Sequence, residues 1–282
     1  MPFGNSKRPL IMGILNITPD SFSGDGLLAH QDPAAAAGAQ AAQMVGEGAD
    51  ILDIGGESSR PSSIPVSVEE EMRRVIPVIA AIRQKFPNLP IAIDTVKAAV
   101  AQAALDAGAT IINDISALGD PDMAPLAAVR KCWVVLMDNR SNPDAVTQDA
   151  KIGGEYRATD SADVTKDVIR NLSERAAAAQ KAGIAKDKII LDPGLGFGKT
   201  VEQNLGLIRD IGRLKELGYS VLVGPSRKSF IGRVLDAPVE GRLEGTAALV
   251  AASTLKGADV IRVHDVQFMA RVAKMAAATG PV

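Results

Sequence analysis

Eight short apolar runs, most of them rich in β-branched residues, recur along the chain and constrain its fold more than any other feature. The runs are continuous rather than alternating in polarity, which is typical of parallel strands that are covered on both faces. We therefore expect eight parallel strands, at Leu10–Leu15, Ile51–Ile54, Ile91–Ile93, Thr110–Ile112, Trp133–Met137, Ile189–Leu191, Ser220–Val223 and Val260–Val263.

The segments between these runs are amphipathic or rich in alanine, and they carry helix start and stop signals. Asp32 followed by Pro33 is typical of a helix N-terminus, and Ser67 with Glu70 has the spacing of a capping box. Glycine often precedes the next strand, as expected where a helix ends in a left-handed residue. We expect such helix ends at Gly48, Gly108, Gly183, Gly218 and Gly257.

The number of strand-helix units predicts the architecture. Eight units in 282 residues favour a closed (β/α)8 TIM barrel over an open, doubly wound sheet. No interior linker or shift in composition suggests a second domain, so residues 1–282 are predicted to form one barrel domain. The polar stretch Asp138–Asp160 is too long for an ordinary connection, and we expect it to be either a lid or a disordered loop.

Composition excludes several classes of function. The formal net charge is −2, so no general field attracts nucleic acid or an anionic membrane, and anion recognition must be local. No apolar window approaches the ~18 residues needed to cross a bilayer, and nothing near the N-terminus suggests export. The single cysteine, Cys132, cannot form an internal disulfide, which fits a reducing cytoplasm, and it is expected to be a small buried hydrophobe.

Every predicted strand ends in, or is closely followed by, a polar or charged residue. Active sites of barrels of this kind lie at the C-terminal ends of the strands. A single Asp or Asn at a strand end is usually a cap, but a full set of eight favours a functional site. The set is Asn16, Asp53 with Glu57, Asp94, Asn113 with Asp114, Asp138, Asp192, Ser226–Ser229, and Arg262 with His264.

The charges of these side chains suggest two separate regions. Asp94, Asn113 and Asp192 supply acceptors and amide groups that suit a planar heterocycle rich in N–H donors. Arg60, Arg262 and His264 supply donors, and the alternation of strand side chains places Arg262 and His264 on one face, as in an anion clamp. His264 alone could equally be a structural hydrogen-bonding residue.

The expected ion is Mg²⁺. The chain has two histidines and no cluster of Cys or His, which argues against a tightly held transition metal. Mg²⁺ brought in with a phosphate fits better, because it prefers oxygen ligands and keeps much of its water.

The loop after Ile189–Leu191 runs from Asp192 through three glycines to Lys199. Its spacing matches neither the phosphate-cradling loop nor the dinucleotide fingerprint. The glycines are expected to let a bound molecule approach the backbone and the flanking Phe197 and Lys199. In the next loop, Lys228 could form a Schiff base, as in barrel aldolases, or hydrogen-bond a ligand; its place outside an apolar strand favours the hydrogen bond.

Seven phrases, in this order, resemble the dihydropteroate synthase family and cover nearly the whole chain. They are Met12–Ser23, Asp53–Pro61, Ile93–Thr95, Ile112–Ile115, Asp192–Lys199, Ser226–Gly232 and Arg262–Val266. The resemblance implies a barrel enzyme, usually a homodimer. It would join 4-aminobenzoate to the pyrophosphate ester of 6-hydroxymethyl-7,8-dihydropterin, giving 7,8-dihydropteroate and pyrophosphate in folate synthesis, with Mg²⁺ and no covalent intermediate.

The resemblance also implies roles for residues. Catalysis would rest on Asp94, Lys228 and Arg60. The pterin would be held by Asp94, Asn113, Met137, Asp192, Phe197 and Lys228. Pyrophosphate would be held by Asn16, Arg60, Arg262 and His264, with Asn16 also on the metal. Aminobenzoate would lie among Ser59, Pro61, Phe197 and Ser229. Gly194–Gly198 would then make room for the flat heterocycle, with the phosphates across the barrel mouth.

The chain departs from the family pattern at two positions. Asp138 follows Met137 where the family commonly has histidine, and Ser59 stands where threonine is common. The change at Ser59 is mild because the hydroxyl remains, whereas Asp138 leaves the role of the fifth loop open.

Three different functions are compatible with a barrel of this kind. A pterin-dependent methyltransferase would share the pterin pocket but would not need the phrases around Ser59 and Lys228. A catalytically silent paralogue could bind a partner, but it would be expected to have lost residues such as Asp94 or Arg262. An aldolase would need Lys228 to react with a carbonyl substrate.

Overall fold

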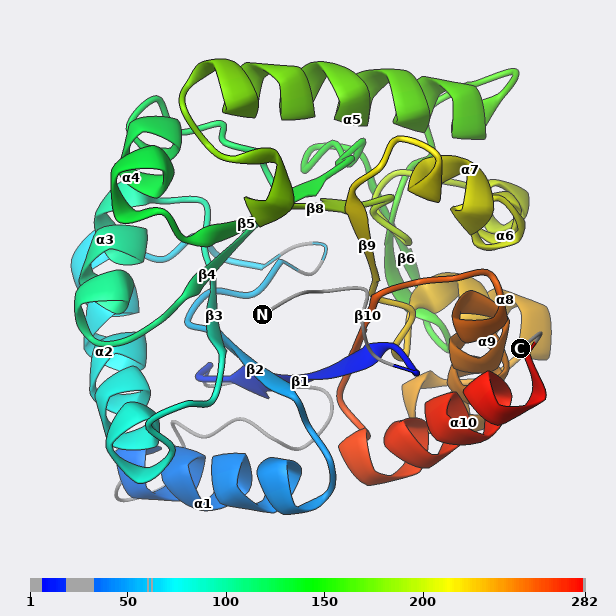
Figure 1. The fold of residues 1–282 in the computed structure, drawn as a ribbon. Helices are drawn as coiled ribbons and strands as arrows, with labels where there is room; N and C mark the ends of the chain where they lie inside the picture. The colour runs from blue at the N-terminus through cyan, green and yellow to red at the C-terminus, as the bar shows by residue number, and fades with distance from the viewer. Residues whose placement is uncertain (1–6, 19–32, 60, 62, 281–282) are drawn as a thin grey trace.

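The structure is a computed structural model that describes residues 7–18, 33–59, 61 and 63–280. Eight parallel strands close into a barrel in the order β1-β10-β9-β8-β5-β4-β3-β2, with the helices arranged around it (Figure 1). The predicted TIM barrel is therefore confirmed. Barrel closure pairs β1 with both β2 and β10, which joins the two ends of the chain in one sheet.

All eight predicted strands are present, with ends that shift by at most two residues. The barrel strands are β1 Leu10–Asn16, β2 Ile51–Gly55, β3 Ile91–Asp94, β4 Ile111–Asp114, β5 Trp133–Met137, β8 Ile189–Asp192, β9 Ser220–Val223 and β10 Val260–Val263. Most shifts add the polar residue that follows the apolar run, because that residue still pairs with its neighbouring strand.

The α-helices fill the connections between the strands. They are α1 Pro33–Gly46, α2 Val68–Lys85, α3 Ala98–Asp106, α4 Met123–Arg130, α5 Val164–Lys181, α6 Val201–Arg209, α7 Ile211–Lys215, α8 Ser229–Leu235, α9 Leu243–Leu255 and α10 Val266–Thr279. Two short 3-10 helices are also present, η2 Lys186–Lys188 and η3 Val239–Gly241.

The helix signals agree with the structure where it describes them. Helix α1 begins at Pro33, while Asp32 lies outside the described residues. Ser67 caps α2 by accepting a hydrogen bond from the Glu70 backbone N–H, although the Glu70 carboxylate pairs with Arg73 and Arg74. All five glycines predicted to end helices have positive φ, between 75° and 113°.

The stretch Asp138–Asp160 is not a structureless loop. It contains an antiparallel hairpin of β6 Val146–Asp149 and β7 Gly153–Tyr156. The sequence did not predict this hairpin, because its strands are polar and short. Ion pairs to α8, more than 70 residues away along the chain, help to hold it in place.

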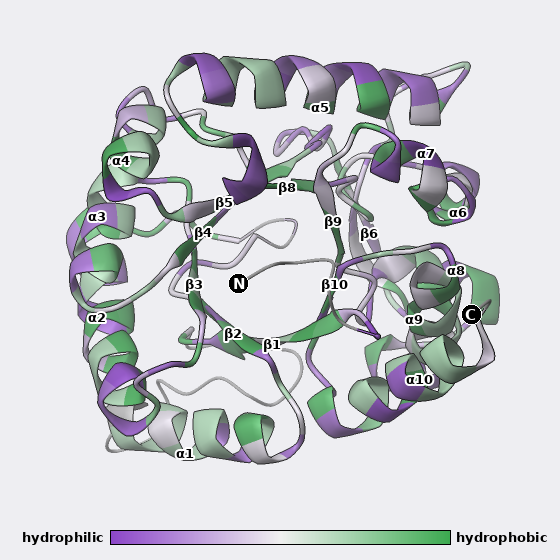
Figure 2. Cartoon of the chain, viewed as in Figure 1, coloured by the Kyte–Doolittle hydropathy of each residue, from purple (hydrophilic) through white to green (hydrophobic). Residues whose placement is uncertain are grey.

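The barrel separates two apolar layers. Outward-facing strand residues pack against the helices in the larger cluster, while eight inward-facing residues form a smaller cluster inside the barrel. The strands are coloured mainly as hydrophobic in Figure 2. Cys132 is buried, as predicted, and burial raises the pKa of its thiol to about 11.

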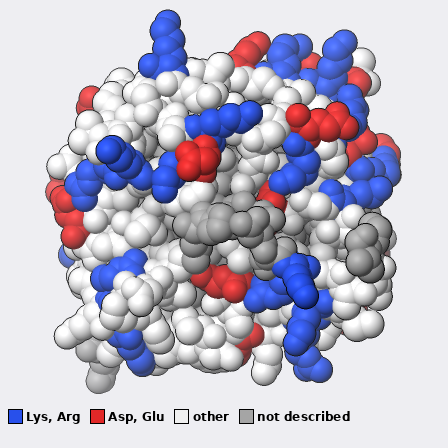
Figure 3. All heavy atoms as spheres, in the orientation of Figure 1, with Lys and Arg blue, Asp and Glu red and all other residues white. Residues whose placement is uncertain are grey.

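The surface agrees with the nearly balanced charge of the chain. On the face seen in Figure 3, lysine and arginine side chains are spread around the molecule, with acidic side chains among them. Among the described helices, none has the length and apolar character needed to cross a membrane.

Candidate active site

The interior of the barrel changes from apolar to polar between one layer of side chains and the next. The apolar layer takes one residue from each strand: Met12, Ile51, Ala92, Ile111, Val135, Ile190, Leu222 and Val260. Because strand side chains alternate, the residue two positions later points the same way. This second layer is Ile14, Asp53, Asp94, Asn113, Met137, Asp192, Gly224 and Arg262. Five of its eight members are polar or charged, and they lie towards the C-terminal ends of the strands.

Arg262 forms the centre of this polar layer. Its Nε donates to Asp53 Oδ2 at 2.6 Å, and its Nη2 donates to Asp94 Oδ2 at 2.7 Å. Asn113 Nδ2 also donates to Asp53 Oδ2, at 3.1 Å. Asp53 is fully buried, and its Oδ1 has no hydrogen-bond partner among the described residues. Asp53 therefore orients both Arg262 and Asn113.

The two regions predicted from the sequence are thus joined. Arg262, which was assigned to a separate anion-binding region, makes ion pairs with Asp53 and Asp94. The sequence placed Asp53 at a strand end but gave it no role. Its partner Arg262 is 209 positions away, so only barrel closure reveals the pair.

Burial changes the protonation of the carboxylates in this layer. It raises the pKa of Asp94 to about 7, although Arg262 opposes the shift. Burial also raises the pKa of Asp192, which is opposed by a hydrogen bond from the Gly194 backbone and by Lys228. A carboxylate whose charge is disfavoured in this way gains when a ligand offers it N–H donors or positive charge.

Lys228 lies next to these acids, directly before α8. Its Nζ lies 4.2 Å from the centroid of the Phe197 ring, within the range of a cation–π contact. Burial and the charge of Arg262 together lower the pKa of Lys228 to about 8, although Asp192 and Asp94 oppose the change. The ammonium thus lies over an aromatic face and within electrostatic range of two carboxylates.

Ser226 holds His264 beside the polar layer. The Ser226 Oγ lies 2.9 Å from His264 Nδ1 and accepts a hydrogen bond from the His264 backbone N–H at 3.2 Å. Next to them, Arg227 forms an ion pair with Asp265 at 2.6 Å. These contacts fix the loops that follow β9 and β10 relative to each other.

Asn16 lies near Asp94 across a glycine. A Cβ atom on Gly55 would lie 3.8 Å from both Asn16 Oδ1 and Asp94 Oδ2. Both oxygens therefore lie in van der Waals range of the Cβ position of Gly55. The amide oxygen of Asn16 and the carboxylate oxygens of Asp94 and Asp53 are the kind of donor that Mg²⁺ prefers.

The glycines after Asp192 have a different purpose from the one predicted. A Cβ atom on Gly194 would overlap the carbonyl oxygen of Asp138, and one on Gly198 would overlap that of Arg140. A Cβ on Gly196 would lie 3.1 Å from Lys228 Cδ. Gly194 and Gly198 make room for the loop after β5, whereas Gly196 makes room for the Lys228 side chain.

Lys199 was expected near a ligand, and this expectation is wrong. Its buried Nζ donates to the carbonyl oxygens of Asp138 and Gly194 at 2.8 and 3.0 Å, and lies 3.0 Å from Asp138 Oδ1. Burial alone would raise the pKa of Asp138, but Lys199 and Arg140 lower it. Asp138, which replaces the family's usual histidine, therefore serves to fix the loop after β5.

The loop after β2 is described only in part. Arg60 lies outside the described residues, while Ser59 and Pro61 are half-buried. Lys97 anchors the start of the loop, because its Nζ contacts the carboxylates of both Glu57 and Glu71. Neither Lys97 nor Tyr156, whose hydroxyl donates to the Ser59 carbonyl at 3.1 Å, was predicted from the sequence. No local signal marks either residue.

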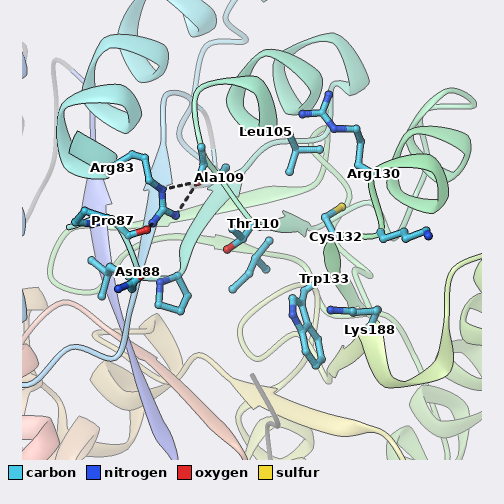
Figure 4. Close-up of a pocket in the computed structure, with 15 residues that line it drawn as sticks. Arg83, Pro87, Asn88, Leu105, Ala109, Thr110, Arg130, Cys132, Trp133 and Lys188 are labelled. Carbon is cyan, nitrogen blue, oxygen red and sulfur yellow. Dashed lines mark hydrogen bonds between the residues drawn. The ribbon is translucent and has the colours of Figure 1, made fainter. Parts of the chain in front are cut away.

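A cavity of about 540 Å³ lies at the other end of the barrel, at the N-terminal ends of β3, β4 and β5. Trp133, Cys132 and Lys188 are among its lining residues (Figure 4). The polar layer does not line it. The Arg83 guanidinium in this cavity is occupied by the carbonyl oxygens of Phe86, Pro87 and Gly108. Catalytic residues of barrels come from the opposite ends of the strands, so this cavity is not the candidate active site.

Known proteins are similar to this chain in both sequence and structure. The model of the pterin binding enzyme family matches residues 12–264. Dihydropteroate synthase from Synechocystis sp. is 45% identical over 276 residues, covering 97% of this chain and 91% of the relative. The enzyme of the same name from Bacillus subtilis is 46% identical over 270 residues, covering 95% and 88%.

A solved structure extends the likeness to three dimensions. Xanthomonas albilineans dihydropteroate synthase, determined with 4-aminobenzoic acid, superposes with a TM-score of 0.86 at 40% identity, covering 97% of this chain and 94% of that one. Fold, polar layer and sequence therefore agree. The chain belongs to the pterin binding enzyme family, and within it to the dihydropteroate synthases.

Proposed function

We propose that this enzyme joins 4-aminobenzoate to 6-hydroxymethyl-7,8-dihydropterin pyrophosphate, giving 7,8-dihydropteroate and pyrophosphate in folate biosynthesis. The observation that carries the proposal is the polar layer, where Asp94, Asn113, Asp192 and Arg262 project from four strands towards one end of the barrel, with Lys228 beside them. This is the end at which barrel enzymes act.

The pterin would bind in this layer. Asp192 would accept two N–H bonds from the amino-pyrimidine edge, since a carboxylate suits a guanidine-like pair of donors. Asn113 and Lys228 would bond its other polar atoms, while Met137 and Phe197 would pack against the ring. Both side chains are buried next to Asp192 and Lys228, which supports this assignment.

Pyrophosphate would bind beside the pterin. Asn16, Arg262 and His264 would hold it, and Arg60 would reach it from the loop after β2. The contact of Arg262 with Asp94 supports a compact arrangement in which the leaving group and the reacting carbon share one neighbourhood.

Mg²⁺ would join the pyrophosphate. Asn16 Oδ1 and Asp94 Oδ2 both lie 3.8 Å from the Cβ position of Gly55, and amide and carboxylate oxygens are donors that suit the ion. Asn16 would supply its amide oxygen as a ligand. When bound, the ion would neutralise part of the negative charge of the departing pyrophosphate.

The reaction would be dissociative. Arg262 and Arg60 stabilise the charge that develops on pyrophosphate as the carbon–oxygen bond breaks. Asp94 stabilises the positive charge left on the pterin methylene. The amine of aminobenzoate, held among Ser59, Pro61, Phe197 and Ser229, then attacks this carbon and releases one proton to solvent. Positioning and preorganised charge would supply the rate without a covalent intermediate, and Lys228 acts as a donor rather than a nucleophile.

The enzyme would be a cytoplasmic homodimer. Its single cysteine fits a reducing compartment. Five exposed large hydrophobics gather on neighbouring helices, and their burial against a second copy would supply an interface: Val234, Leu235, Leu255, Phe268 and Met275.

The test is to incubate the purified enzyme with Mg²⁺, the pterin pyrophosphate and 4-aminobenzoate, and to measure pyrophosphate release and dihydropteroate by mass spectrometry. Asp192→Asn is expected to lower kcat/KM about 100-fold, because two charge-assisted hydrogen bonds are weakened. Asp187→Asn is the matched control, since Asp187 is exposed in η2 at the far end of the barrel. Folded wild-type enzyme that forms no product would contradict the proposal.

A further inference from the structure

The β6–β7 hairpin is held by a well-defined turn. Asp149 pairs with Gly153 across a three-residue turn, and the Asp149 carboxylate accepts hydrogen bonds from the backbone N–H groups of Lys151 and Ile152, both at 2.8 Å. Gly153 has a φ of 91°, which suits a residue that closes such a turn. The hairpin therefore has a definite shape of its own.

The hairpin is anchored to α8, the helix that begins with Ser229. Arg233 of α8 donates to Asp149 on one strand and to Glu155 on the other, both at 2.8 Å. The buried Arg242, which directly precedes α9, donates to the carbonyl of Ile152 in the turn at 2.7 Å. Two arginines thus fix both strands and the turn to the part of the chain that carries Ser229.

The other side of the hairpin reaches the loop after β2. The Tyr156 hydroxyl donates to the Ser59 carbonyl at 3.1 Å, across 97 positions of sequence. A Cβ atom on Gly154 would lie 3.2 Å from Pro61 Cβ, so β7 passes close to that residue too. The hairpin therefore touches both Ser59 and Pro61.

Tyr156 also contacts Phe197. The two rings are stacked with their centroids 6.4 Å apart and an angle of 20° between their planes, a favourable geometry for an aromatic pair. Burial raises the pKa of Tyr156, so its hydroxyl remains a donor at neutral pH. One side chain thus links Phe197 to the loop that carries Ser59, while its own strand is tied to the helix of Ser229.

We propose that Tyr156 is a positioning residue for 4-aminobenzoate, and that the β6–β7 hairpin forms an outer wall of the aminobenzoate pocket. This inference rests on the proposed function. The hydroxyl fixes the loop at Ser59, and the ring fixes the plane of Phe197, so that the two sides of the pocket keep the spacing of a flat benzoate. The pterin residues Asp94, Asn113 and Asp192 lie on barrel strands and do not depend on the hairpin.

The test compares Tyr156→Phe, Tyr156→Ala and Tyr219→Phe. Tyr219 is the only other tyrosine in the sequence, and it lies just before β9, away from the polar layer. Its hydroxyl accepts a hydrogen bond from the Gln180 side chain. Tyr156→Phe keeps the stacked ring and is expected to raise KM for 4-aminobenzoate about fivefold, the value of one hydrogen bond. Tyr156→Ala also loses the ring contact, and an increase of about 20-fold is expected.

The pattern across the two substrates decides the outcome. For Tyr156→Phe, we expect the KM for the pterin pyrophosphate and the midpoint temperature of thermal unfolding to match those of the Tyr219→Phe control. Equal increases in both KM values, or no increase for 4-aminobenzoate in the Phe variant, would overturn the proposal even if Tyr156→Ala fails to fold. Inactive wild-type enzyme would instead contradict the proposed function, and this inference would fall with it.

The anchor on α8 offers a second readout. Arg233→Gln releases both strands of the hairpin and is expected to raise KM for 4-aminobenzoate several-fold. Arg213→Gln removes an ion pair of similar exposure with Asp210, at the start of α7, and serves as its control. An unchanged KM in Arg233→Gln would show that the hairpin is not a wall of the pocket.

Discussion

Asp94 and Lys228 show how one environment shifts an acid and a base towards each other. Burial raises the pKa of Asp94 from 3.8 to about 7 and lowers that of Lys228 from 10.5 to about 8. Both groups therefore titrate near neutral pH, where a small change in surroundings alters their charge. Substrate binding can use this, because an N–H donor or a cation favours ionised Asp94.

The two pKa shifts change the free energy of unfolding in opposite directions and over different ranges of pH. Folded Asp94 binds its proton more tightly than the unfolded chain does, so its contribution to the free energy of unfolding falls as pH rises from about 4 to about 7. Folded Lys228 binds its proton less tightly, so its contribution rises as pH increases from about 8 to 10.5. Near pH 7.5, both the Asp94 carboxylate and the Lys228 ammonium lower the free energy of unfolding.

We expect a bell-shaped pH profile of kcat/KM for the pterin pyrophosphate. Activity should rise through about pH 7 as Asp94 ionises and fall above about pH 8 as Lys228 loses its proton. Steady-state kinetics across pH 5.5–9.5, a range of about four units, would test this. Lys228→Arg should move the alkaline limb beyond that range, because arginine stays charged.

Asp94→Asn serves as the companion variant. It should abolish the acid limb, and it should slow single-turnover chemistry more than it weakens pterin binding. An acid limb that persists in Asp94→Asn, or equal losses in rate and binding, would show that Asp94 does not stabilise the pterin cation.

At the scale of elements, two connections on the same side of the barrel depend on each other. The loop after β5 packs against Gly194 and Gly198, which follow β8. The Lys199 ammonium donates hydrogen bonds to the carbonyl oxygens of Asp138 and Gly194 and so links the two loops. The hairpin that follows is braced by α8. These mutual contacts help to fix the conformation of both connections.

Gly198→Ala tests this dependence. The residue has a φ of 62°, and an added Cβ would overlap the Arg140 carbonyl oxygen, so we expect a loss of about 2 kcal/mol or more in the free energy of unfolding. Gly38→Ala is the control, because a Cβ added to Gly38 within α1 would meet no other atom within 4 Å. We expect this change to raise the free energy of unfolding by about 0.5 to 1 kcal/mol. Urea denaturation measures both, and similar stabilities would refute the close approach.

At the scale of the whole molecule, the described surface has an uneven distribution of apolar side chains. Seven large hydrophobics are exposed among the described residues, and five of them belong to α8, α9 and α10. Phe268 and Met275 are seven positions apart on α10, which places them on the same face of the helix. These helices lie together on one side of the barrel (Figure 1).

We expect this side to form the homodimer interface. Phe268→Glu combined with Met275→Glu should shift the mass measured by light scattering from dimer to monomer, because two buried charges would oppose association. Val129→Glu is the control, since Val129 is 78% exposed on α4, away from these helices. A double variant that remains dimeric would place the interface elsewhere.

Local patterns along the chain were enough to predict the barrel and most of the polar layer. Continuous apolar runs and helix caps are local signals, and the alternation along a strand decides which residues share a face. Asp94, Asn113 and Asp192 could therefore be identified one strand at a time, from the polar residue at or just after the end of each apolar run, and Arg262 from its place as the charged residue within the last run.

The contacts that these residues make became known only from the folded chain. Arg262 reaches Asp94 across 168 positions because barrel closure brings β10 and β3 around one interior. Gly194 and Gly198 lie against the loop after β5, and Tyr156 reaches Ser59 from a polar hairpin. Such contacts depend on where distant segments meet in space, and a periodic pattern along the chain carries no information about that meeting.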